Sequence, residues 1–289
     1  MKPFIALNII LFSVFLHAIE APEFPEPHRY IVDRFSDSNP IGHTFLYRGI
    51  MDNTRPSIAL SHQNREWGYN WFLMATVIPT QWGYVSFGYS NYATNNLPVT
   101  KKDKISIYLD GYMSDTFEIM AASFQPSLDG VQLQLILNYK YRQLAGAHQK
   151  KAVALDAHVT SKFILNNQLG LRMNNVLSTP YENKDGNEEL PRYMGMYAWF
   201  PVSVFTLFFD ANACLNYRYL SYFSGQTVVD IDEQLALLFN INYADIFSSV
   251  GIGTSLKLSD YFQLMYMHQQ EKTDAFDLSI HSISIGVTF

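Results

Sequence analysis

The stretch from Ala275 to Phe289 alternates between apolar and small or polar side chains. Its apolar members near the end, at every second position, are Ile283, Ile285, Val287 and Phe289. Because successive side chains of a β-strand point to opposite faces, the pattern predicts a strand with one apolar face. The change of phase at His281 and Ser282 suggests a β-bulge there or a short outer segment. Such a strand suits either the edge of a soluble β-sandwich or a membrane-embedded sheet.

The same alternation recurs along most of the chain after Arg55. It begins with the segment from Tyr69 to Val77 and is clearest from Val131 to Tyr141. The segments are about 10 to 14 residues long, enough for a tilted strand to cross a bilayer. We count about thirteen and expect fourteen, with twelve as a fallback, because single-chain bacterial barrels have even strand numbers. The ambiguous pieces are Thr44 to Ile50 and Ile105 to Leu109.

The composition favours a closed β-barrel over other membrane folds. Only 16% of the residues are charged and 15% are aromatic, yet the mean hydropathy is -0.04. After the N-terminus there is no run of about 20 apolar residues, so helical spans are not expected. In lipid every backbone group must be paired within the protein, which leaves an edgeless sheet. We predict an all-β fold, a transmembrane antiparallel β-barrel over residues 55–289, with the apolar strand faces against lipid.

The first 54 residues differ from the rest. Lys2, an apolar run from Phe4 to Leu16 and a small residue at Ala18 or Ala21 predict a signal peptide over residues 1–21. Export would bring the chain to the bacterial outer membrane. Residues 22–54 are expected to be irregular, because prolines 22, 25, 27 and 40 supply no backbone donor. This segment is either periplasmic or a small plug in the lumen.

Polar side chains on the other strand faces predict an interior polar network, the usual content of a narrow barrel. Its members are Lys140, Arg142, Asp156, His158, Arg172 and Asp210. The eight histidines show no metal-ligand spacing, and no GxSxG, Walker A or HExxH motif occurs. We therefore expect no catalytic residues, no metal and no cofactor. The candidate outward loops are residues 91–103, 143–150, 181–189 and 219–230.

The partners follow from the charge and from the closing strand. A net charge of -6 argues against a nucleic-acid partner. The end of the chain resembles bacterial outer-membrane β-barrels, whose closing strand carries the signal read by the barrel-insertion machinery. The resemblance assigns Gly286, Val287 and Phe289 to this assembly signal. It implies outer-membrane lipid and the insertion machinery as partners, and pairing of the closing strand with the first one.

Residues 110–200 resemble the PorV/PorQ family of outer-membrane barrels. The matching positions are Tyr141, Leu144, Asp156, Gly170, Leu171, Asn175, Leu190 and Pro191, whereas Ile41 and Leu177 depart from the family pattern. The resemblance implies a fatty-acid-transporter-like barrel without enzyme activity. It further implies a scaffold of the type IX secretion system that carries or anchors secreted cargo. The alternatives are a channel for hydrophobic or small solutes and, least favoured, an outer-membrane hydrolase.

Overall fold

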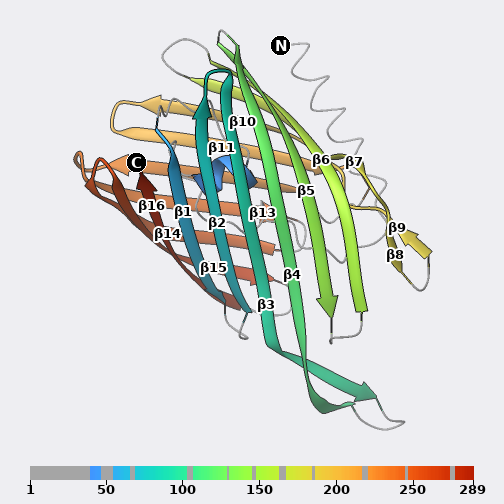
Figure 1. Cartoon of the computed structure of the whole chain (residues 1–289). Helices are drawn as coiled ribbons and strands as arrows, with labels where there is room; N and C mark the ends of the chain where they lie inside the picture. Colours follow the sequence, from blue (N-terminus) through green and yellow to red (C-terminus); the bar gives the residue numbers. More distant parts are fainter. Residues whose placement is uncertain are drawn as a thin grey trace, which may run out of the picture.

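The computed structural model describes residues 40–46, 55–65, 69–102, 107–128, 130–144, 148–162, 167–183, 186–216, 221–244, 247–273 and 277–289. Within these residues, fourteen antiparallel strands close into one barrel, as predicted (Figure 1). Its strands are β1 (Ser57–Arg65), β2 (Tyr69–Thr80), β3 (Gly83–Lys102), β4 (Ile107–Leu128), β5 (Val131–Leu144), β6 (His148–Lys162), β7 (Gln168–Ser178), β10 (Tyr193–Val202), β11 (Phe205–Cys214), β12 (Tyr222–Asp230), β13 (Leu235–Ala244), β14 (Phe247–Ser259), β15 (Phe262–Thr273) and β16 (Asp277–Thr288). A separate hairpin, β8 (Tyr181–Asn183) and β9 (Gly186–Glu188), lies between β7 and β10 in sequence.

The barrel closes where its first strand pairs with its last. β1 and β16 are antiparallel and paired from Ser57 with Thr288 to Arg65 with Ile280, which confirms the predicted closure. The predicted bulge at His281 and Ser282 is wrong, because β16 pairs with both neighbours there without a register shift. The change of phase has a simpler cause: Ile280 is an apolar residue that faces the lumen and is fully buried.

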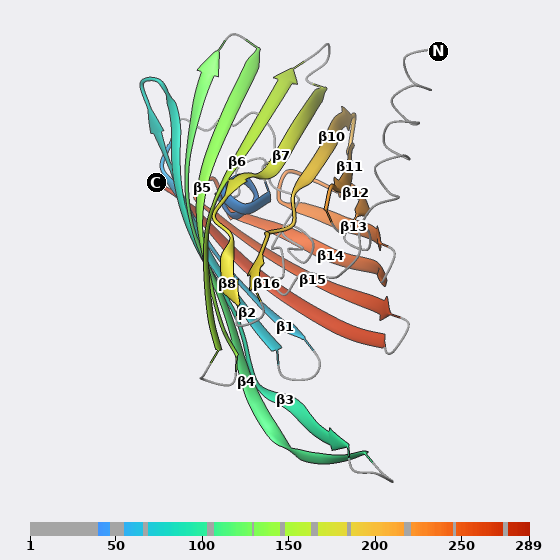
Figure 2. The same cartoon turned by 90° about the vertical axis from the view of Figure 1, so that its right-hand side faces the viewer.

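The two ends of the barrel differ. At one end, here called the turn end, lie Ser57, Thr288 and connections such as the one between β14 and β15. At the opposite end β3 and β4 continue as a long ribbon well beyond the other strands (Figures 1 and 2). Their pairing shifts register after Thr94 and again after Val99, so the ribbon is irregular as it leaves the barrel.

Two of the predicted outward loops are mostly strand. Residues 91–102 belong to β3, and residues 222–230 form β12. The alternation of apolar residues did not reveal β12. The outward face of this strand carries Gly225 and Thr227 beside Phe223, so it is only weakly apolar. The stretch 181–189 holds the β8–β9 hairpin, and residues 143–144 and 148–150 are strand ends.

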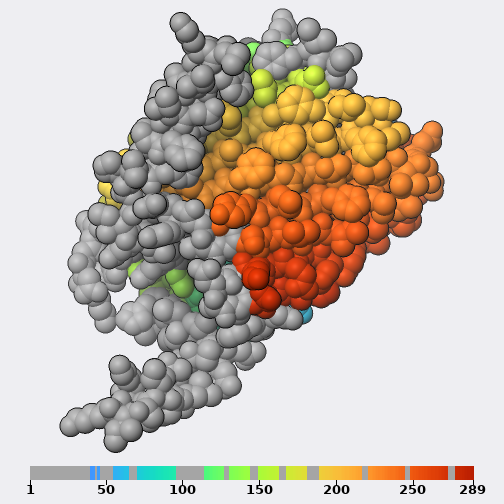
Figure 3. Space-filling model, turned by 180° about the vertical axis from the view of Figure 1, so that it is seen from behind, coloured from blue at the N-terminus to red at the C-terminus, as the bar shows by residue number. Residues whose placement is uncertain are grey.

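The outer surface is a belt of exposed apolar side chains, as expected for contact with lipid. Leu137 on β5, Leu171 on β7 and Ile241 on β13 are each more than half exposed. Figure 3 shows the strands from β10 (yellow) to β16 (red) as one continuous outer surface. Among the described residues, no helix is long and apolar enough to cross a membrane.

A short segment lies inside the barrel. Residues 40–46 include a single helical turn, η1 (Gly42–Leu46), which contacts β2, β3 and β4 (Figures 1 and 2). Of the two ambiguous pieces, residues 44–46 are therefore helical, whereas residues 107–109 belong to β4. The predicted signal peptide, residues 1–21, and the rest of the segment 22–54 apart from residues 40–46 lie outside the described residues.

Candidate functional site in the barrel lumen

One side of the lumen is apolar, which the sequence did not predict. On β2, Trp71 and Leu73 are 1% and 0% exposed and point inward, whereas Phe72 and Met74 are 40% and 39% exposed and point outward. The expectation that the face from Tyr69 to Val77 contacts lipid is wrong, because β2 is apolar on both faces. We call this inner surface the apolar wall; its members are Ala59, Trp71, Leu73, Ala75, Phe117, Ile119 and Ala121.

The segment of residues 40–46 packs against the apolar wall. Ile41 and Phe45 are buried in the same cluster as the wall residues. The close approach needs Gly88 on β3, because a Cβ at this position would lie 2.5 Å from Phe45 Cζ and 2.7 Å from Thr44 Cγ2. Part of the apolar wall is therefore covered by the chain itself.

Trp71 of this wall is also held by one hydrogen bond and one ring contact. Its indole Nε1 donates a hydrogen bond to Ser90 Oγ at 2.6 Å, and its ring meets Tyr92 edge to face at 5.2 Å between centroids. The buried indole N–H is thereby satisfied, as buried tryptophans require. The large ring is held in a defined orientation on the inner surface.

Polar side chains on β5, β6, β7 and β11, here called the polar wall, begin directly beside the apolar wall, because Lys140 is paired with Ile119. Their first cluster is centred on Asp156 of β6. Asn138 Nδ2 donates to Asp156 Oδ2 at 2.7 Å, and the backbone N–H of Asn175 donates to Asp156 Oδ1 at 2.5 Å. Asn175 has a φ of 54°, next to a register shift between β6 and β7, so its backbone N–H can reach the carboxylate. Lys140 Nζ donates to Asn175 Oδ1 at 3.1 Å. One asparagine thus links the lysine and the aspartate.

The second cluster joins Arg172 of β7 to Asp210 and Asn212 of β11. The guanidinium donates from Nε to Asn212 Oδ1 at 2.7 Å, and from Nη2 to Asp210 Oδ1 and to Tyr222 Oη, the latter at 2.9 Å. β10 lies between these strands, and its Gly195 is paired with both Arg172 and Asn212. A Cβ at Gly195 would lie 2.1 Å from Asn212 Oδ1, so the glycine leaves the space in which the two side chains meet.

The structure distributes the six predicted network residues over three places. Lys140 and Asp156 belong to the first cluster, and Arg172 and Asp210 to the second. His158 is buried and is paired with Arg172 across β6 and β7. Arg142 instead forms an ion pair with Asp115 of β4, with contacts of 3.0 and 2.9 Å.

Sequence reasoning missed the residues that connect these charges or pair with them. Asn175, Asn212, Tyr222 and Asp115 were not assigned to the network, although each contacts one of its members. The asparagines at 174, 175 and 212 in otherwise apolar strands were the available signal. Among the described residues, no group of three or more His, Cys, Asp or Glu side chains is arranged to hold a metal ion.

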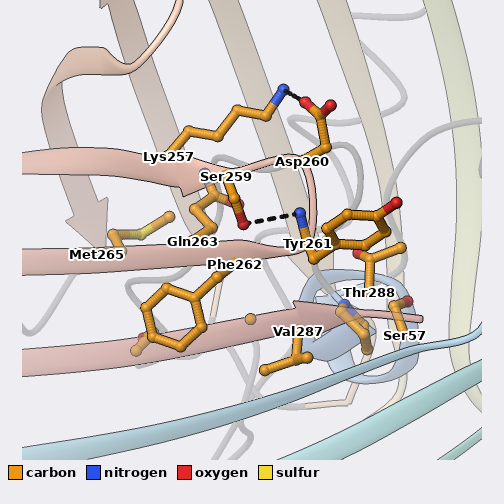
Figure 4. A pocket seen from close by; sticks show the side chains of 13 residues that line it. Ser57, Lys257, Ser259, Asp260, Tyr261, Phe262, Gln263, Met265, Val287 and Thr288 are labelled. Carbon is orange, nitrogen blue, oxygen red and sulfur yellow. Dashed lines mark hydrogen bonds and ion pairs between the residues drawn. The ribbon is translucent and has the colours of Figure 1, made fainter.

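A cavity of about 240 Å³ opens at the turn end of the lumen (Figure 4). Its lining includes Pro40, Ser57, Gln263, Met265, Ser284 and Gly286. Of the three residues predicted to form the assembly signal, Gly286 and Val287 line this cavity and Phe289 is 68% exposed. Their role in assembly stays a prediction.

Comparisons with known proteins support the architecture. No protein-family model matches the chain, and no curated protein matches its sequence. Among solved structures, it is similar to the CymD monoaromatic hydrocarbon channel, with a TM-score of 0.62 at 10% identity over 88% of this chain and 94% of that one. It is also similar to the toluene transporters TodX of Pseudomonas putida (TM-score 0.57, 10% identity, 94% and 99% covered) and TbuX of Ralstonia pickettii (0.58, 9%, 87% and 92%). At these identities the likeness shows a shared barrel fold.

Proposed function

We propose that this protein is an outer-membrane channel, without enzymatic activity, that passes small hydrophobic solutes. The apolar wall carries the proposal. The interior of a water-filled barrel is ordinarily polar, and large apolar side chains are rarely placed against water. Trp71, Leu73 and Phe117 are at most 1% exposed beside Ile41 and Phe45, so a passing solute would contact them only where residues 40–46 are displaced.

The charges of the polar wall support a neutral solute. Arg172 forms an ion pair with Asp210, and Arg142 forms one with Asp115. The four charges therefore largely neutralise one another. An ion in the lumen would find few free counter-charges among them. The similar channels are named for monoaromatic hydrocarbons and toluene, which makes toluene the first solute to test.

The test is uptake of radiolabelled toluene by cells of a Gram-negative host that express the full chain, with a radiolabelled sugar as a hydrophilic reference. We expect faster toluene uptake than in cells without the protein. Leu73→Asn should lower this uptake several-fold, because it introduces an amide into the apolar wall. Val204→Asn is the matched control, since Val204 lies in the turn between β10 and β11, is 47% exposed and should not affect passage.

Each variant must first be present in the outer membrane as a folded barrel, shown by a heat-dependent shift in gel mobility. Toluene uptake equal to that of cells without the protein, although the folded barrel is present, would refute the channel. Recovery of the chain in the outer-membrane fraction of these cells tests the proposed location.

The secretion scaffold implied by the PorV/PorQ resemblance stays a prediction. Its test is a pull-down from native membranes, in which secretion components or cargo should be recovered. We prefer the channel because apolar side chains on the inner face of the barrel suit the passage of a hydrophobic solute, whereas the proposed scaffold role makes no use of them.

A further inference from the structure

The cavity at the turn end combines room for a small molecule with a side chain that requires a partner. Its volume of about 240 Å³ is below the ~300–1,000 Å³ typical of sites for drug-sized ligands. Met265 and Pro40 contribute apolar surface, and Ser57 and Thr288 lie together at one side (Figure 4). The cavity suits a compact solute with a polar end.

Ser57 indicates where the polar end would be. It is 2% exposed and lines the cavity, yet its hydroxyl makes no hydrogen bond with any described residue. Buried polar atoms in folded proteins nearly always have a partner, and each exception requires an explanation. The hydroxyl can both donate and accept, so a ligand hydroxyl is a suitable partner.

The charges at the cavity favour a neutral ligand. Lys257 Nζ lies 2.8 Å from Asp260 Oδ1 (Figure 4). The hydrogen bond from Lys257 lowers the pKa of the Asp260 carboxyl below its ordinary value, so this carboxyl is ionised at neutral pH. The two groups balance each other, and an anionic ligand would have to compete with Asp260 for the lysine.

Gly286 sets the free space. It lies between Ala59 of β1 and Gln263 of β15 in the ladder, and no described atom is within 4 Å of a Cβ built at this position. A larger side chain here would extend into the cavity without displacing the backbone. Gly286, which the resemblance assigns to the assembly signal, is therefore placed to determine the size of a bound solute.

We propose that this cavity binds a small neutral aromatic alcohol such as phenol, with the ligand hydroxyl paired to Ser57 Oγ and its size limited by residue 286. The inference rests on the proposed function, since it treats the lumen as the path of a solute. It can nevertheless fail separately, because equilibrium binding to purified protein requires no transport.

The experiment is equilibrium dialysis of the purified full chain in detergent micelles against radiolabelled phenol, toluene and benzoate, with protein-free micelles subtracted. We expect phenol to bind more tightly than toluene, which lacks the hydroxyl, or benzoate, which is charged. Ser57→Ala should weaken phenol binding roughly 2- to 10-fold, the range of one net hydrogen bond, and leave toluene unchanged.

The cavity-filling variant is Gly286→Phe, which should abolish phenol binding. Its matched control is Ile285→Phe on the same strand, where the side chain faces outward and is 36% exposed, so binding should be as in the wild type. Every variant is first tested for a heat-dependent mobility shift. If Gly286→Phe does not fold, Ser57→Ala decides alone.

Equal binding of phenol and toluene, or undiminished phenol binding by folded Gly286→Phe, would overturn the site. Loss of phenol binding in Ser57→Ala together with an equal loss of toluene would overturn the assigned hydrogen bond. Phenol binding that follows the expected pattern in a protein that fails the toluene uptake assay would support the site and refute the hydrocarbon channel.

Discussion

The apolar wall and the polar wall have the same outer chemistry and opposite inner chemistry. Leu137 on β5 and Leu171 on β7 face outward, as do Phe72 and Met74 on β2. On the inside, the charges around Arg172 are satisfied by hydrogen bonds from neighbouring strands, whereas the residues around Leu73 need apolar groups against them. The polar wall is therefore stabilised by its own hydrogen bonds, whereas the apolar wall is stabilised by the packing of Ile41 and Phe45 against it.

The largest effect is expected where the polar wall loses one charge. Asp210→Ala leaves Arg172 buried without its carboxylate, which should lower the free energy of unfolding by about 3–5 kcal/mol. The measurement is urea unfolding in detergent, followed by the heat-dependent gel shift. Glu189→Ala is the control: its ion pair with Arg192 at 3.3 Å is exposed, and its loss should cost about 0–1 kcal/mol. Equal losses of unfolding free energy in the two variants would show that the buried cluster does not stabilise the polar wall.

A smaller effect separates the inner and outer apolar faces. Leu73→Ala should cost about 2–5 kcal/mol in the same assay, because it creates a cavity in the cluster that Leu73 forms with Ile41 and Phe45. Leu137→Ala removes the same atoms from a side chain that is 54% exposed on the lipid face, where detergent or lipid fills the space. It should cost distinctly less, and the reverse order would contradict the assignment of the two faces.

The smallest effect concerns a single methyl group in the polar wall. Gly195→Ala places a Cβ at 2.1 Å from Asn212 Oδ1 and should separate Arg172 from Asn212, at about 1–3 kcal/mol. In Gly225→Ala the nearest atom is Phe223 Cε1 at 3.7 Å, an ordinary contact, so unfolding should be nearly unchanged. If Gly195→Ala is as stable as Gly225→Ala, the contact of Arg172 with Asn212 across β10 does not contribute to stability.

The sequence was sufficient for the barrel, and it indicated which charged side chains face the lumen but not the partners that they contact. β5 and β16 have one apolar and one polar or small face, and alternation alone orients them. Alternation could not orient β2 and β4, because both faces of these strands are apolar. The pattern then does not indicate which face points into the lumen. The contact of Arg172 with Asn212 was equally out of reach, because it depends on β10 lying beside β7 although the β8–β9 hairpin intervenes in sequence.

The pairing of β1 with β16 also has a kinetic consequence. The hydroxyls of Ser284 and Ser61 meet at 2.9 Å although they are 223 positions apart in sequence. Ladders of such high contact order form slowly, because the loop-closure entropy must be overcome before the contacts form. Until the last strand arrives, the growing sheet has two open edges that can pair with other chains. Closure by β16 therefore removes both edges in one step, and only then is the sheet protected from pairing with other chains.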